Sequence, residues 1–130
     1  MSATARGPGD AIRRRPQADA LTAAMVDLRL GNRASAQRHL DAVAAVLEQL
    51  LKNGDKRFGV EELFATVQAL RGDLDGAMRH LTRAADLGWR RSWWAQREPD
   101  LAALSGRADF SALMARLDAS NAEIRARVKD

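Results

Sequence analysis

Residues 65–84 have the sequence ATVQALRGDLDGAMRHLTRA, and residues 24–43, which lie 41 positions earlier, have the sequence AMVDLRLGNRASAQRHLDAV. Seven positions are identical in the two segments, and they include one glycine and the run Arg-His-Leu in each. In both segments the glycine separates two stretches whose apolar residues recur at helical spacing. A chain that repeats such a unit builds the same supersecondary structure twice. The sequence therefore predicts two helical hairpins in tandem, in an all-α fold.

Further signals predict the ends of these helices and two additional helices. Gly31-Asn32 and Gly72-Asp73 each combine a residue that ends a helix with one that caps the next. The four hairpin helices are expected from Gln17 to the stop at Gly31, from Arg33 to Asn53, from after Gly59 to the stop at Gly72, and from Leu74 to Gly88. A short helix is expected from Pro99 to Leu104. A long final helix is expected to bury one face made of Phe110, Leu113, Met114, Leu117, Ile124 and Val128.

Composition limits the classes to which this chain can belong. It has 130 residues and no cysteine, which fits one helical domain without a disulfide or a thiolate metal site. We expect a disordered basic tail at residues 1–16, a helical domain at residues 17–130, and a cytoplasmic protein without a membrane span. Residues 1–20 contain four arginines and two aspartates, a net +2, so the rest of the chain carries only the other +2 of the formal net charge of +4. The basic character therefore belongs partly to the tail.

Several positions of the second hairpin form a pattern of a small residue, a turn, and then alanine, a bulky residue and alanine. They are Ala65, Gly72-Asp73, Ala77, Leu81 and Ala84. This pattern resembles the tetratricopeptide repeat, and the resemblance covers residues 58–91 and, less closely, residues 17–53. The chain departs from the family at the aromatic and proline positions, which are occupied by Glu61, Gln68 and Trp89.

Residues 77–117 carry a second resemblance. They contain the segments LTRAADLGWR, WWAQREPDLAAL and RADFSALMARL, which resemble the C-terminal end of repeat domains in bacterial winged-helix regulators and adenylate-cyclase-linked proteins. Those domains are regulatory or protein-binding modules. The resemblance implies hairpins stacked into a short superhelix, with the first helix of each hairpin on a concave face and an aromatic-bearing cap at the end.

Two surfaces are candidate partner-binding sites. The concave face implied by the repeat would be lined by Leu21, Met25, Leu28, Arg29, Glu62, Thr66, Ala69 and Leu70, unless the long second helix or the N-terminal segment fills it. The other candidate is a patch made of Arg90, Arg91, Trp93, Trp94 and Arg97. Adjacent residues of a helix point in different directions, so one of Trp93 and Trp94 should stay partly exposed while the other tryptophans pack into the cap.

No catalytic, cofactor or metal site is predicted. His39 and His80 are the only histidines, and they hold equivalent positions of the repeat, where a repeated structural role is expected. The carboxylates of Glu61-Glu62, Asp73 and Asp75 lie at helix starts, where they cap the helix or complement its dipole. The sequence contains no phosphate-loop, zinc-protease or nucleophile-elbow motif. We therefore expect a protein that is not an enzyme.

The leading hypothesis is a scaffold or adaptor that binds a protein or peptide partner, because helical repeats provide a surface and this chain provides no reaction centre. Two repeats are fewer than the roughly three that bury a continuous core, so a homodimer is a further hypothesis. A small-molecule sensor pocket beneath the tryptophans is another.

The alternative hypothesis is a nucleic-acid-associated regulatory protein that uses Arg13–Arg15 and the patch at Arg90 and Arg91. It predicts DNA or RNA binding that weakens steeply as salt rises and when residues 1–16 are deleted, because counterion release drives such binding. Fluorescence anisotropy with labelled oligonucleotides at about 50 mM and about 200 mM salt measures both effects. Absence of binding at the lower salt concentration would dispose of this hypothesis.

Overall fold

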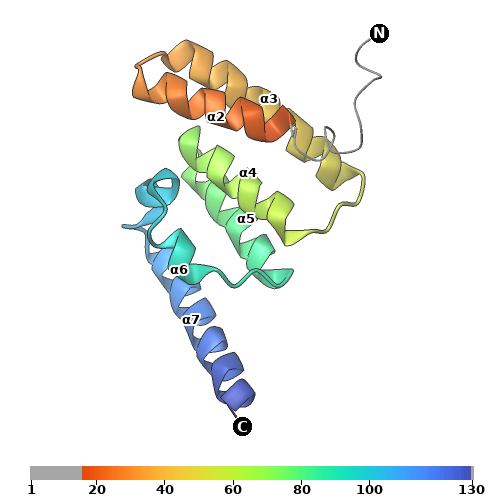
Figure 1. The fold of residues 1–130 in the computed structure, drawn as a ribbon, viewed down its shortest axis with the longest axis vertical. Coiled ribbons are helices and arrows are strands. Elements are labelled where there is room, and N and C mark those ends of the chain that lie inside the picture. Colours follow the sequence, from red (N-terminus) through yellow and green to blue (C-terminus); the bar gives the residue numbers. More distant parts are fainter. Residues whose placement is uncertain (1–15, 130) are drawn as a thin grey trace. The chain divides into compact units, whose positions relative to one another are not determined.

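The computed structural model describes residues 16–129, which form six α-helices and one 3₁₀ helix and contain no strand (Figure 1). The helices are α2 (Pro16–Arg29), α3 (Arg33–Lys52), α4 (Phe58–Leu70), α5 (Leu74–Asp86), α6 (Ser92–Ala95), η2 (Pro99–Leu104) and α7 (Ala108–Lys129). The expected all-α class is confirmed. The predicted tail lies outside the described residues except for Pro16, with which α2 begins.

Two details of the C-terminal third differ from the sequence prediction. The segment from Pro99 to Leu104 forms a 3₁₀ helix, in which Pro99 occupies the first turn and the Glu98 carboxylate accepts a hydrogen bond from the backbone N–H of Asp100. One turn of α-helix, α6, precedes it, and its bounds were not predicted. Four residues are too few to show a helical period, so no apolar pattern marks this turn.

The described chain divides into two compact units, one that ends at Val46 and one that begins at Leu47, inside α3. The first unit contains α2 and the part of α3 that ends at Val46. Within it, the Ser35 hydroxyl of α3 donates a hydrogen bond of 2.6 Å to the Asp27 carboxylate of α2, and His39 lies 3.6 Å from the same carboxylate. Ala24 and Ala36 are completely buried, as expected where small residues let two helices approach.

The second unit contains the α4–α5 hairpin, whose turn repeats that of the first. Gly31 and Gly72 both have positive φ, 82° and 86°. Each glycine N–H donates to the carbonyl three residues earlier, so both hairpins use the same helix-ending turn. Asp73 then caps α5 by accepting a hydrogen bond of 2.9 Å from the N–H of Gly76. A Cβ at Gly76 would meet the Asp73 carboxylate where it now lies, so a larger residue there would make this side chain shift.

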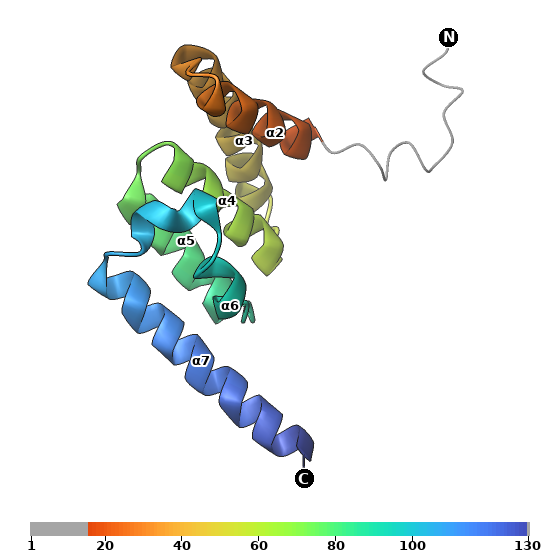
Figure 2. The same ribbon diagram turned by 60° about the vertical axis from the view of Figure 1, so that its left-hand side comes forward.

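The core of the second unit joins the hairpin to the C-terminal third. η2 packs on α4, and α7 packs on α5 and α6 (Figure 2). These elements share one cluster of buried residues, made of Ala65, Ala69, Ala77, Met78, Leu81, Ala84, Ala85, Trp89, Ala95, Leu101, Leu104, Phe110, Leu113, Met114 and Leu117. Burying each leucine of this set contributes about 1.5–3 kcal/mol to folding. The segment from α6 to α7 thus packs against the hairpin, and the superhelix that it was expected to cap stays a prediction.

The inward face of α7 is shorter than predicted. Residues up to Leu117 on this face are buried, but Ile124 and Val128 are 44% and 79% exposed. The reason is length: α7 has 22 residues, whereas α5, on which it packs, has 13. At about 1.5 Å per residue, α7 exceeds α5 by roughly 13 Å, so its last turns find no neighbour in this unit.

The turn at Gly72 generates a stability prediction. Gly72→Ala places a Cβ in the positive-φ region and should lower the free energy of unfolding by about 1 kcal/mol. Nothing lies within 4 Å of the added atom, so backbone strain is the only cost. Gly106→Ala is the matched control, because it also meets nothing within 4 Å but its φ lies outside that region. Urea unfolding followed by circular dichroism compares them, and equal effects would contradict the strain argument.

Candidate functional site

Trp89 fixes the start of the candidate site. Trp89 follows Gly88, whose φ of 117° turns the chain back after α5. The backbone N–H of Trp89 donates a hydrogen bond to the Ala84 carbonyl. The Trp89 side chain is completely buried. Its indole N–H donates a hydrogen bond of 2.6 Å to the Glu62 carboxylate of α4. A buried indole needs such a partner, and a charged acceptor makes the bond stronger.

The same Glu62 carboxylate lies 3.6 Å from an Nη atom of Arg91. The Arg91 guanidinium in turn lies 4.9 Å from the centroid of the Trp94 ring, within the range of a cation–π interaction. Trp94 also packs against the core cluster. Glu62, Trp89, Arg91 and Trp94 therefore form one connected group that links α4 to the segment leading into α6.

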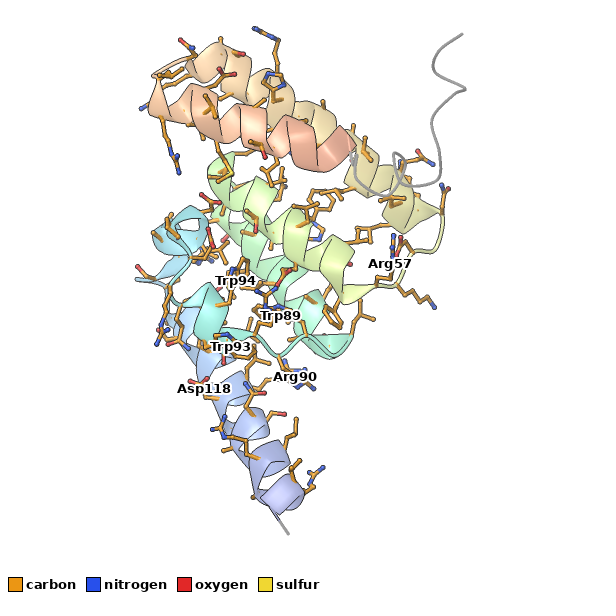
Figure 3. All side chains as sticks on the ribbon, in the orientation of Figure 1. Arg57, Trp89, Arg90, Trp93, Trp94 and Asp118 are labelled. Carbon is orange, nitrogen blue, oxygen red and sulfur yellow. The ribbon has the colours of Figure 1, made fainter. Side chains whose placement is uncertain are left out.

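Trp93 lies outside this group and is 57% exposed. Figure 3 shows the three tryptophan side chains and their neighbours on the ribbon. Successive residues of a helix differ by about 100° in direction, so fixing Trp94 on the core turns Trp93 toward solvent. This confirms the prediction that one of the two adjacent tryptophans is partly exposed.

A groove of about 340 Å³ lies between the α6–η2 segment and α7. It is lined by Gln96, Ser105, Phe110, Ser111, Met114, Ala115 and Asp118. Gln96, which lines the groove, follows Trp93 by three residues, close to one helical turn, so the two side chains leave the chain in similar directions. The groove offers an apolar floor, formed by Phe110 and Met114, and polar edges.

Two contacts hold the wall formed by α7. The Ser92 hydroxyl donates a hydrogen bond of 2.5 Å to the Asp118 carboxylate. The Asn121 amide donates to the Arg90 carbonyl at 2.9 Å. Because both contacts reach the segment that Trp89 anchors, α6 and α7 are held together across the end of the groove.

The arginines predicted for the patch have different surroundings. Arg90 is half-buried, and its guanidinium donates to the carbonyls of Ala85 and Trp89. Arg91 is engaged with Glu62 and Trp94. The Arg97 side chain is exposed and makes no hydrogen bond or ion pair with any residue between 16 and 129. Arg97 is therefore the arginine of the patch whose charge is left for a partner.

The residues predicted for the concave face belong to different units. Leu21 and Met25 are half-buried and Leu28 and Arg29 exposed, all in the first unit. In the second unit, the Glu62 carboxylate accepts a hydrogen bond from Trp89, and the hydroxyl of the buried Thr66 donates one to the Glu62 carbonyl. Ala69 belongs to the core cluster, and Leu70 is half-buried. A common groove across α2 and α4 stays a prediction.

A second buried polar pair joins α4 to α5. His80 Nδ1 lies 2.6 Å from a carboxylate oxygen of Glu61, and the two side chains are 10% and 7% exposed. The imidazole also stacks on the Phe64 ring at a centroid distance of 4.0 Å. Sequence reasoning missed this pair, because 19 residues separate its members.

Comparisons of the chain with models of known protein families, with curated proteins and with solved structures found no match. Within residues 16–129, no group of three or more His, Asp or Glu side chains is arranged to hold a metal ion. No helix of this part of the chain has the length and apolarity that crossing a membrane requires.

The Glu62–Trp89 bond generates the next prediction. Glu62→Leu leaves a buried indole N–H without an acceptor and should lower the free energy of unfolding by about 1–3 kcal/mol, whereas Glu62→Gln keeps an acceptor and should cost less. Urea unfolding gives both values, and the NMR signal of the Trp89 indole proton reports the bond directly. Glu48→Leu, at an exposed position of α3, is the control. A smaller loss for leucine than for glutamine would contradict this role.

Proposed function

We propose that this chain is a non-catalytic, tetratricopeptide-like interaction module that binds a short segment of a partner protein through Trp93 and the adjoining groove between α6 and α7. The repeated hairpin turns at Gly31 and Gly72, and the cap that closes the second hairpin, support the kinship to that repeat. The family resemblance of the C-terminal third adds that such ends serve regulatory or protein-binding domains.

The exposure of Trp93 carries the proposal. A tryptophan buries about 150–250 Å² when it is covered, and this residue type is enriched among those that dominate binding energy at interfaces. The 57% exposed indole lies beside tryptophans that are buried or packed on the core. Its neighbours are held by Glu62, Ser92 and Asp118, so the surface that presents Trp93 is already ordered before a partner arrives.

The groove next to Trp93 indicates what the partner contributes. A volume of about 340 Å³ is at the lower end for ligand pockets and suits one or two side chains. Phe110 and Met114 on its floor favour an apolar side chain, while Gln96, Ser105 and Ser111 favour a polar backbone beside it. The unpaired Arg97 favours an acidic residue at the rim. We therefore infer a short segment with an apolar anchor and a neighbouring carboxylate.

The use of the nearby acid–base side chains supports a binding role over a catalytic one. Glu62 accepts from Trp89, Glu61 pairs with His80, and Asp118 accepts from Ser92. Each of these carboxylates stabilises a contact between helices. A general acid or base must instead reach a proton of the substrate.

Peptide selection tests the proposed function. Peptides displayed on phage and selected on the wild-type protein should converge on an apolar residue next to an acidic one. Trp93→Ala should weaken a selected peptide about tenfold or more, because it removes the anchor, which is a loss of about 1.4 kcal/mol or more. Isothermal titration calorimetry measures the affinity, and NMR shifts of α6 and α7 amides locate the site.

Leu30→Ala is the matched control for Trp93→Ala, since Leu30 is an exposed apolar residue of the first unit at 69% exposure. This control should leave the affinity unchanged. Selected peptides that bind Trp93→Ala as tightly as wild type would overturn the proposal. Binding of single-stranded oligonucleotides to Trp93 in place of peptides, with a steep dependence on salt, would favour the nucleic-acid hypothesis instead.

A further inference from the structure

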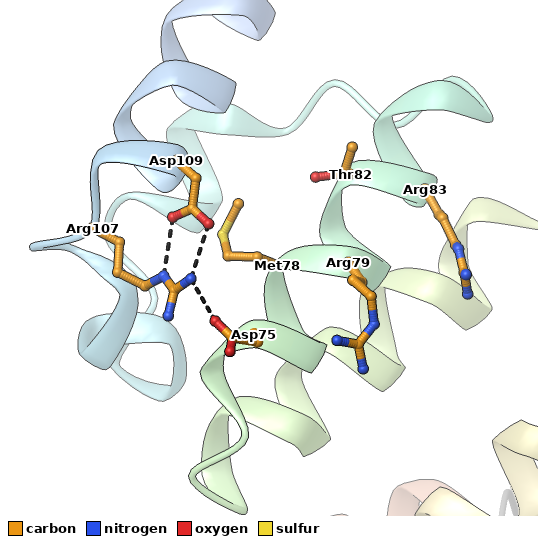
Figure 4. Close-up of a pocket in the computed structure, with 7 residues that line it drawn as sticks. All are labelled: Asp75, Met78, Arg79, Thr82, Arg83, Arg107 and Asp109. Atoms are coloured by element: carbon orange, nitrogen blue, oxygen red, sulfur yellow. Dashed lines mark hydrogen bonds and ion pairs between the residues drawn. The ribbon is translucent and has the colours of Figure 1, made fainter.

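A second surface of the same unit carries charge that nothing within it neutralises. Arg79 and Arg83 lie four residues apart on α5, on one face of the helix, and both are exposed. Neither guanidinium has a hydrogen bond or an ion pair with any residue in the described part of the chain. Figure 4 shows both guanidinium groups on one side of a groove. Like charges at this spacing repel, so this surface favours an anionic partner.

The opposite side of the groove is formed by a closed ion-pair network. Arg107 donates hydrogen bonds to Asp75 at 2.8 Å and to both carboxylate oxygens of Asp109 at 3.0 Å (Figure 4). The Arg107 guanidinium lowers the pKa of Asp109, so this carboxylate stays ionised at neutral pH. One guanidinium thus serves two carboxylates, and this side keeps a net negative charge. Arg107 is not left for a ligand, which distinguishes it from Arg79 and Arg83.

The floor between the two sides is the least polar part. It is formed by Met78, which is buried, and Thr82, which is half-buried (Figure 4). The groove has a volume of about 600 Å³ and is open along its length. It follows α5 from Asp75 to Arg83, eight residues or about 12 Å, which is a little over two helical turns. A narrow strip of low polarity between a positive and a negative side matches the pattern of an amphipathic helix.

We propose that this groove binds an amphipathic helix of a partner protein, with two carboxylates four residues apart on Arg79 and Arg83 and an apolar side chain on Met78 and Thr82. Four residues of a helix rise about 6 Å, so carboxylates at this spacing match the two arginines, which have the same spacing on α5. The helix then lies along α5 beside the start of α7, as a neighbouring helix lies in a bundle. The site is separate from the Trp93 groove and does not depend on the function proposed for it.

A designed peptide tests this site on the full chain. The probe is a capped alanine-based helix of about 16 residues, long enough to be helical alone, with two leucines in one stripe and two glutamates four residues apart on one flank. NMR titration follows the arginine Nε–H signals and the backbone amides. We expect the signals of Arg79 and Arg83 and the amides of α5 to shift, while the Arg107 signal stays in place because its partners are internal.

Two comparisons decide the outcome. Replacing both glutamates of the peptide by glutamine, and the protein variant Arg79→Gln/Arg83→Gln, should each weaken binding at least about fivefold, because each removes two charge pairs. The control variant Arg38→Gln/Arg125→Gln removes the same charge from exposed positions of α3 and α7 and should bind as wild type. The peptide comparison uses unaltered protein and so does not depend on how a variant folds.

Three results would overturn the proposal. They are equal affinity for the glutamate and glutamine peptides, shifts that map to α6 and the Trp93 groove while α5 is unchanged, and no shift at millimolar peptide concentration. Each would show that Arg79 and Arg83 do not recognise an acidic helix.

Discussion

The hydrogen bond between the Trp89 indole and the Glu62 carboxylate is the contact on which the second unit depends. Trp89 is the largest completely buried side chain of the described residues. It lies between the end of the α4–α5 hairpin and the segment that contains α6, η2 and α7. Ser92 and Asn121 tie α7 to the segment that begins with it. Fixing one side chain in the core thereby sets the direction of α6, the exposure of Trp93 and one wall of the neighbouring groove.

The sequence predicted the parts of the fold that depend on local chemistry. Gly31 and Gly72 end helices through a turn that requires positive φ, and Asp73 caps the next helix, so each can be recognised from a few adjacent residues. The divergence of Trp93 and Trp94 also followed from helix geometry alone. Which of the two faces solvent did not, because that choice depends on Glu62 and Arg91, and Glu62 lies 27 residues before Trp89. The Arg79–Arg83 groove was missed for the same reason, since Arg107 meets Asp75 across 32 residues.

The two proposed surfaces differ in how they would select a partner. At Trp93, burial of an aromatic ring would provide most of the affinity, and Arg97 would adjust specificity. At Arg79 and Arg83, charge would guide the approach and salt would weaken it, with a smaller apolar contribution from Met78. The two surfaces use different side chains of one unit. A single chain of this size can therefore offer one partner two contacts, or connect two partners.

The space that Gly76 leaves for the Asp73 cap has a consequence for the repeat itself. Ser35 holds the equivalent position in the first hairpin, 41 residues earlier, and there the side chain is used: its hydroxyl binds Asp27. One hairpin thus fills the position with a hydroxyl, and the other keeps it empty for a carboxylate from the turn. The two hairpins therefore use different side chains at equivalent positions 35 and 76. A serine at position 76 would make the Asp73 carboxylate move, and a glycine at position 35 would remove the bond to Asp27.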